Sequence, residues 1–220
     1  MQSSHAIVAD LIDGAPPLII WLTLNAVSTL LLLRDLRRLN PQTVGLMRWV
    51  WILTVLYSGP IGLAVYYYSG RRQIPDDNIW RRSFRSVAHC YSGCGAGEIA
   101  GLIVTAGLLG LGTVWVSLGT FAFAYVMGFA MTIGPLIADG EPFWKAIKDS
   151  FIAETVSITI MEVTAIGVDI WLAGDATIGE PRFWLSMLIS LTLGLFAAYP
   201  ANVAMIKARI KSGMGHPGGS

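Results

Sequence analysis

Long apolar segments constrain this chain more than any other feature of its sequence. A helix needs about 20 mostly apolar residues to cross a bilayer, and an open sheet edge cannot be satisfied in lipid. Six stretches are long and apolar enough to cross as helices: residues 16–33, 48–68, 87–109, 113–137, 151–173 and 183–206. We therefore predict an all-α, polytopic transmembrane helix bundle of six spans with short loops, and treat residues 1–220 as a single integral membrane domain.

Composition supports a membrane protein and limits its partners. Hydrophobic residues make up 54% of the chain and charged residues 13%, whereas a soluble domain carries about a quarter charged residues. The mean hydropathy is +0.61. The net charge of +1 gives no reason to expect a nucleic-acid partner, so the lipid bilayer is the expected environment. Two cysteines do not make a disulfide framework.

Basic residues orient the helices, because cytoplasmic loops carry an excess of Lys and Arg. They concentrate in residues 70–86, in residues 138–150 and in the C-terminal tail, which indicates a cytoplasmic C-terminus. With six spans, both termini lie in the cytoplasm, and the loop 34–47 lies outside although it carries three arginines. Two resolutions remain open: either 48–68 is re-entrant and breaks at Ser58-Gly59-Pro60, or the first pair of spans departs from the rule. We predict six full spans.

A row of polar residues interrupts the third apolar stretch, which opens with HCYSGCGAGE at residues 89–98. Cys90, Cys94 and Glu98 follow one another at intervals of four residues, so they share one helix face, and His89 sits at the cytoplasmic end. At ~1.5 Å per residue, Glu98 lies about 16 Å from the start of the helix, near the bilayer centre. An acidic side chain there costs roughly 2.5 kcal/mol or more, so Glu98 is a functional candidate.

The fifth stretch carries a matching pair of acids, Glu154 and Glu162, eight residues apart. Counted from the cytoplasmic ends of the two helices, Cys90 lies as deep as Glu154, and Glu98 as deep as Glu162. Two carboxylates at one depth need a cation or a shared proton. We therefore predict that the third and fifth helices lie side by side, with close approach provided by the small residues Gly93, Gly97 and Gly101.

The residue types on this face indicate a ligand. Thiolates and imidazole suit Cu(I) and Zn(II). We predict a site for a copper ion, or second for a zinc ion, formed by His89, Cys90, Cys94 and Glu98. The alternative for the Cys and His residues is a buried apolar thiol pair and an interfacial histidine. A disulfide between the two cysteines is disfavoured, because side chains four residues apart on a helix run roughly parallel.

Further side chains extend this site into a possible pathway. The row predicted to line a pathway or to couple protons consists of Glu98, Glu154, Glu162 and Asn202. Met127 and Met131, four residues apart in the fourth stretch, are candidate thioether ligands, with ordinary packing as the alternative. Asn202 follows a proline at a helix end close to the cytoplasmic surface, where ordinary helix termination is the alternative.

At these residues the sequence resembles an uncharacterised family of membrane proteins, the domain-of-unknown-function family 4396, found in bacteria, archaea and fungi. The resemblance implies a membrane domain, here expected in the cytoplasmic (inner) membrane of a prokaryote, and no activity. It departs from the family pattern at Glu98, where aspartate is expected. It covers most of residues 41–216 and is carried by Ala88-His89-Cys90, Gly93-Cys94, Gly97-Glu98, Val50-Trp51 through Ser58-Gly59-Pro60, Tyr66, Pro200-Ala201-Asn202 and the tail 210–216.

Three functions are compatible with these patterns. The first is a transporter or channel for a soft transition-metal ion, with the Cys/His/Glu face as its site. The second is a non-transporting subunit or assembly factor of a larger membrane complex, and a homo-oligomer is also possible. The third is a thiol redox membrane protein acting through Cys90. An enzyme is not the expectation, because the sequence has no Gly-rich phosphate loop, no Ser/His/Asp set and no HExxH motif.

Overall fold

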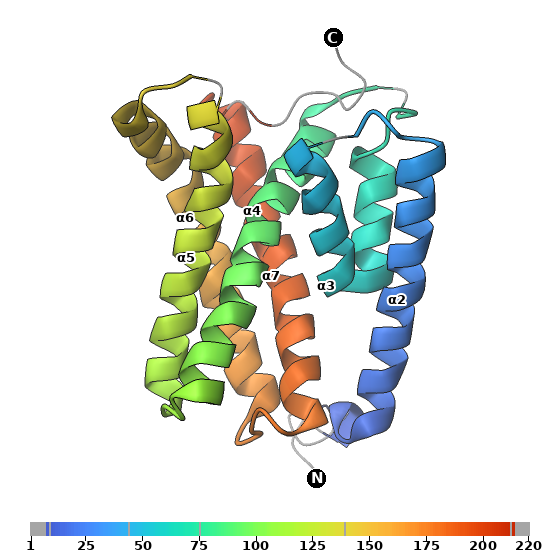
Figure 1. The fold of residues 1–220 in the computed structure, drawn as a ribbon, viewed down its shortest axis with the longest axis vertical. Coiled ribbons are helices and arrows are strands. Elements are labelled where there is room, and N and C mark those ends of the chain that lie inside the picture. Colours follow the sequence, from blue (N-terminus) through green and yellow to red (C-terminus); the bar gives the residue numbers. More distant parts are fainter. Residues whose placement is uncertain are drawn as a thin grey trace.

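The computed structural model describes residues 8, 10–43, 45–74, 76–138, 140–211 and 213, and within them the chain is helical without strands, as predicted. The bundle contains the α-helices α2 (Ala15–Arg38), α3 (Gly45–Ser69), α4 (Ile79–Leu102), α5 (Thr113–Ala138), α6 (Phe143–Ala173) and α7 (Pro181–Lys207). A π-helical turn, η1 (Ile103–Leu108), continues α4. Figure 1 shows these helices running along the long axis of the molecule.

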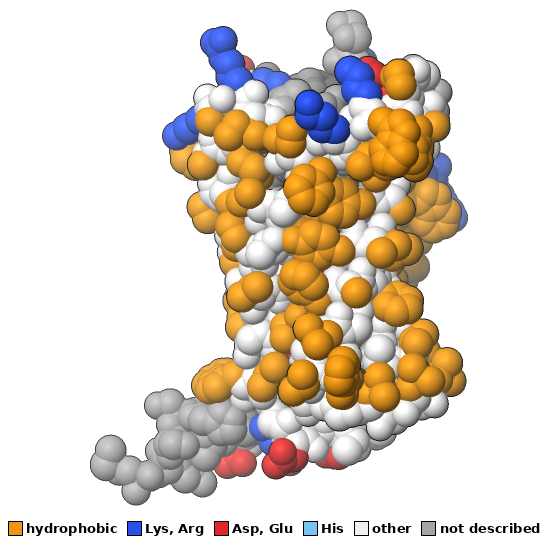
Figure 2. All heavy atoms as spheres, turned by 90° about the vertical axis from the view of Figure 1, so that its left-hand side faces the viewer, with side chains coloured by type: hydrophobic (Ala, Val, Ile, Leu, Met, Phe, Trp, Pro, Cys, Tyr) orange, Lys and Arg blue, Asp and Glu red, His pale blue; other side chains and the backbone are white. Residues whose placement is uncertain are grey.

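The bundle has the surface of an integral membrane protein. Five helices are long and apolar enough to cross a membrane: α2, α3, α5 to Gly134, α6 from Glu154, and α7. In Figure 2, hydrophobic side chains cover the middle of the surface, and Lys and Arg side chains gather at the upper end. Helix α4 does not reach this apolarity, because it begins with several arginines and continues with the polar row. It is instead enclosed by α3, α5, α6 and α7.

Helix α3 is a hairpin of two short arms, in place of the single helix expected over 48–68. Gly59 has φ 54° and ψ −127°, which interrupts the helix, and Pro60 starts the second arm. The rings of Trp51 and Tyr66 lie 5.3 Å apart, although a straight helix would separate these residues by about 22 Å. A Cβ on Gly62 would lie only 2.7 Å from the carbonyl oxygen of Thr54, so the arms touch near the tip.

The tip of the hairpin lies about halfway along the bundle and is fixed by α2 (Figure 1). Asn25 Nδ2 donates to the carbonyl of Leu56, 3.0 Å away, which satisfies a group released at the break. A Cβ on Gly59 would overlap the Asn25 amide. A glycine is therefore required there both by the positive φ and by the space.

Because α3 returns to the end at which it started, the basic segments all meet at one end of the bundle. The end of α2 with its three arginines, residues 70–78, the connection from α5 to α6 and the end of α7 lie together at the top of Figure 1. The first and last described residues lie at opposite ends. The re-entrant alternative for 48–68 thus describes the structure better than six full spans, which would bring the termini to the same end.

The glycine row of α4 packs against α5, and not against α6 as predicted. A Cβ on Gly97 would lie 2.5 Å from the carbonyl oxygen of Phe123, and one on Gly101 would lie 2.7 Å from the Cα of Thr120. The facing residues of α5 are also small and also four apart: Thr120, Ala124 and Gly128. Two small-residue rows therefore bring the backbones of α4 and α5 into contact.

Candidate functional site

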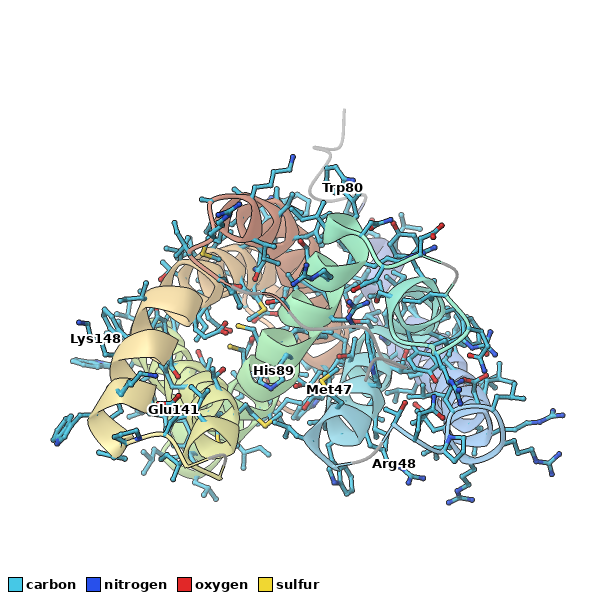
Figure 3. All side chains as sticks on the ribbon, turned by 90° about the horizontal axis from the view of Figure 1, so that it is seen from above. Met47, Arg48, Trp80, His89, Glu141 and Lys148 are labelled. Atoms are coloured by element: carbon cyan, nitrogen blue, oxygen red, sulfur yellow. The ribbon has the colours of Figure 1, made fainter. Side chains whose placement is uncertain are left out.

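Helix α4 carries its polar residues into the centre of the bundle. Asn78 caps the helix, because its Oδ1 accepts from the backbone N–H of Arg81 at 3.0 Å. His89, Cys90, Cys94 and Glu98 are all buried. Seen from the end that holds the C-terminus, His89 lies near the middle of the section, and Lys148 and Arg48 lie at the periphery (Figure 3). The polar face is thus inside the protein and away from lipid.

The two thiols of the site are free and buried. Cys90 Sγ and Cys94 Sγ lie 4.0 Å apart on consecutive turns. The Cys94 sulfur occupies the space left by Gly128 of α5, where a Cβ would lie 2.9 Å from it, and Ile158 of α6 approaches the same point at 3.1 Å. The thiol pair therefore sits where α4, α5 and α6 meet, and its cysteines do not form a disulfide.

Helix α6 brings acidic side chains to this place, and it contacts α4 as predicted. Cys90 lies beside Glu154, which matches the predicted pairing by depth. Cys94 also lies beside Glu162, the predicted partner of Glu98. Glu98 lies within electrostatic range of Glu162 and of Asp169. We call Cys90, Cys94, Glu98, Glu154 and Glu162 the buried seam.

The deepest carboxyls of the buried seam have polar atoms without partners. Glu162 is completely buried, and neither of its carboxyl oxygens has a hydrogen-bond partner among the described residues; the same holds for Oε2 of Glu98. An ionised carboxylate buried without a partner is far more costly than one in water. Such carboxyl groups require a proton, a bound cation or both, so this part of the seam is suited to holding a proton or a cation.

A second cluster closes the seam at the end that holds the C-terminus. Lys211 Nζ lies 2.8 Å from the Glu154 carboxylate and donates to Asn202 Oδ1 at 3.2 Å. Asn202 Nδ2 donates to Ser157 Oγ at 2.7 Å, and Ser86 Oγ donates to Asn202 Oδ1 at 3.2 Å. Asn202, predicted as a pathway residue, therefore connects α4, α6 and α7 at the mouth of the seam.

Lys211 is not among the predicted site residues, because in the sequence it is one of several basic residues of the tail that are typical of membrane-surface anchors. The signal for it was Glu154, since a buried carboxylate close to the cytoplasmic end needs a cationic partner. The next Lys after helix α7 supplies that partner. Tail residues 212 and 214–216, which contribute to the family resemblance, lie outside the described residues.

The structure brings only part of the predicted metal set together. Among the described residues, no group of three or more His, Cys, Asp or Glu side chains is arranged to hold a metal ion. The candidate thioethers do not join the thiols: Met131 packs on Gly93, where a Cβ would lie 2.9 Å from its Cγ, and Met127 is 39% exposed. The two thiols and the neighbouring carboxyls are the groups that the fold assembles.

Comparison with known proteins gives a family and no activity. The family model described as Domain of unknown function (DUF4396) matches residues 79–211, which run from α4 through the buried seam to Lys211. No curated protein and no solved structure matches the chain significantly.

Proposed function

The chain belongs to the DUF4396 family, and we propose that it is a transporter or channel that passes a soft transition-metal ion, copper first and zinc second, along the buried seam. The observation that carries the proposal is the placement of unpartnered carboxyl oxygens of Glu98 and Glu162 beside a pair of free thiols inside a membrane bundle. Intramembrane ionisable residues mark ion pathways and proton relays by default.

The spacing of the thiols supports a soft ion. At a metal–sulfur distance of about 2.3 Å, two sulfurs 4.0 Å apart subtend an angle of about 120° at the ion. This angle lies between the tetrahedral and linear arrangements, so Cys90 and Cys94 can bind one ion without moving the backbone. Glu162 beside Cys94 and Glu154 beside Cys90 are carboxyls that can take up the protons that the thiols release on binding an ion.

The arrangement of charges supports an orientation in the membrane with the C-terminus in the cytoplasm. With the hairpin returning to its own side, every basic segment of the described chain except Arg182 lies at the end that holds the C-terminus. The positive-inside rule then places this end in the cytoplasm without the conflict that six spans create at Arg34, Arg37 and Arg38. The proposed crossings are α2, α4, α5, α6 and α7, and the end of the seam that Lys211 closes then faces the cytoplasm.

The other two hypotheses receive less support. A thiol redox role requires a reagent to reach the sulfur, and Cys90 is only 1% exposed. A role as a subunit or assembly factor does not explain why carboxyls without partners lie inside the bundle.

Two measurements test the proposal. Purified protein is expected to hold copper or zinc, measured by mass spectrometry of the metals, and Cys90→Ala/Cys94→Ala is expected to lose it. In proteoliposomes, Cu(I) or Zn(II) flux is expected for the wild-type chain and not for the double variant. Met127→Ala is the matched control, because it also removes a sulfur side chain but from an exposed position. Equal metal content and equal flux in the wild type and the double variant would refute the proposal.

A further inference from the structure

Lys211 is held in an unusual position for a lysine in a tail. Its side chain is only 10% exposed, although it follows the last turn of α7 by a few residues. Its ammonium group lies 2.8 Å from the Glu154 carboxylate, which is itself 5% exposed, and 3.2 Å from Asn202 Oδ1. A lysine that serves only as an interfacial anchor extends into water. Lys211 instead turns inward and places its charge at the mouth of the buried seam.

The groups around the ammonium are those of a cation site. Glu154 supplies a negative charge, and Asn202 supplies an oxygen whose orientation is fixed, because Nδ2 of the same amide donates to Ser157 Oγ and to the carbonyl of Ala198. Ser86 Oγ donates to the same Asn202 oxygen from α4. Carboxylate and amide oxygens arranged in this way hold the Lys211 ammonium group and are also ligand types that bind metal cations.

The site of Lys211 lies between the end that holds the C-terminus and the first thiol. Glu154, the partner of Lys211, also lies beside Cys90, the first thiol of the buried seam from this end. Any cation that approaches Cys90 from the end that holds the C-terminus meets Glu154 first. While Lys211 neutralises Glu154, the attraction of the mouth for a second cation is lost and the space beside the carboxylate is filled.

We propose that Lys211 is a tethered cation that occupies the outermost binding site of the seam, formed by Glu154 and Asn202, and that an entering cation must displace it. Lys211 then works as a plug at the cytoplasmic mouth: closed when its ammonium group is on Glu154, and open when a metal cation has taken its place. The transport half of this statement rests on the proposed function, and the plug itself rests only on the contacts of Lys211.

Thiol labelling tests the plug without any transport measurement. Cys90 and Cys94 are the only cysteines of the chain, so a small cationic methanethiosulfonate reagent reports on the seam directly. In a Cys94→Ala background, Lys211→Gln is expected to speed labelling of Cys90 about tenfold, as when an opening equilibrium shifts by about 1.4 kcal/mol. A neutral reagent is expected to gain less, because freeing the charge of Glu154 attracts only the cationic one.

The matched control is Lys207→Gln, which removes the same charge from an exposed side chain that lies over the Trp80 ring outside the seam. Its labelling rate is expected to equal that of the parent. Lys211→Arg keeps the charge and is expected to label slowly. Circular dichroism and the thermal midpoint of each variant separate opening of the mouth from unfolding. A variant that melts before labelling is replaced by Lys211→Gln/Glu154→Gln, which removes both charges of the pair, and in which the neutral reagent is expected to label Cys90 faster than in the parent.

The outcomes separate the plug from the transport proposal. Faster labelling of Lys211→Gln together with no metal flux in any variant would keep the plug and overturn the metal transporter. Equal labelling in Lys211→Gln, Lys207→Gln and the parent would overturn the plug, whatever the flux. If both proposals hold, Lys211→Gln also changes the dependence of flux on metal concentration, because the metal no longer competes with a tethered cation.

Discussion

The contact between α4 and α5 depends on residue size at Gly97, and replacing this glycine by alanine measures it. A Cβ there would lie 2.5 Å from the carbonyl oxygen of Phe123 and 2.6 Å from the Cα of Ala124. Both atoms belong to the backbone of α5, so no side chain can rotate away. The helices must separate by about 1 Å to reach an ordinary contact, and overpacking of this kind costs about 1–3 kcal/mol.

The intrinsic preference of the helix acts in the opposite direction. Alanine is more favourable than glycine in a helix interior by about 1 kcal/mol. Gly167 of α6 isolates this term, because a Cβ there would meet no atom within 4 Å. Gly167→Ala is therefore expected to be neutral or stabilising, and Gly97→Ala to lie about 1–3 kcal/mol below it.

Thermal unfolding followed by circular dichroism in detergent is the assay. For a chain of this size, 1 kcal/mol shifts the midpoint by about 2–4 °C. The two variants are thus expected to differ by about 2–12 °C, with Gly97→Ala the lower. Equal midpoints for Gly97→Ala and Gly167→Ala would show that the glycine row of α4 does not set the distance to α5, and the reasoning from small-residue rows would be wrong.

Three further predictions concern the buried acids and the hairpin. Glu162→Gln keeps the shape of the side chain but cannot release a proton or pair with a cation, so it is expected to fold at the wild-type yield and to lose at least about tenfold in metal flux; unchanged flux would contradict a role in the pathway. Asp35 is buried and accepts hydrogen bonds from Asn40, Tyr66 and Arg71. Asp35→Ala is expected to lower the free energy of unfolding by about 3–5 kcal/mol, because these donors lose their acceptor. A midpoint of thermal unfolding within about 2 °C of wild type would count against this prediction. Gly59→Ala combines a positive φ with overlap on the Asn25 amide and is expected to reduce the yield of folded protein, measured by fluorescence-detected size exclusion; a Gly59→Ala variant as stable as wild type would argue against the hairpin geometry.

The sequence predicts the helices of this protein well, because a bilayer demands long apolar segments and leaves few alternatives to a helix. It does not predict the path of residues 45–69. A segment of this length and apolarity is compatible with one long helix or with two short arms. The break at Ser58-Gly59-Pro60 and the fit of Asn25 against it favour two arms over one long helix. The contacts of the second arm with Trp51 show in the structure that the segment folds back. The arginines of loop 34–47 and the break at Ser58-Gly59-Pro60 are the two sequence signals in favour of the hairpin.

The sequence likewise predicts part of the candidate site and misses the rest. The spacing of Cys90, Cys94 and Glu98 predicts a common helix face, and the structure buries the side chains of this face. A row of small residues shows that some helix approaches closely but does not name it, which is why Gly93, Gly97 and Gly101 were assigned to the wrong neighbour. Lys211 was missed because a contact 57 residues away from Glu154 in sequence has no local signature.

The hairpin α3 has a consequence for how this architecture can vary between chains. A segment that leaves and returns on the same side adds no net crossing. The polypeptide can lengthen, shorten or lose it, and every later helix keeps its direction through the bilayer. In the proposed topology, removing α2 would instead invert every later helix and carry the arginines at the start of α4 to the opposite side of the membrane, and removing α4, α5 or α6 would invert the helices after it. Loss of the whole hairpin 45–69 is therefore topologically silent, whereas loss of α2, α4, α5 or α6 is not.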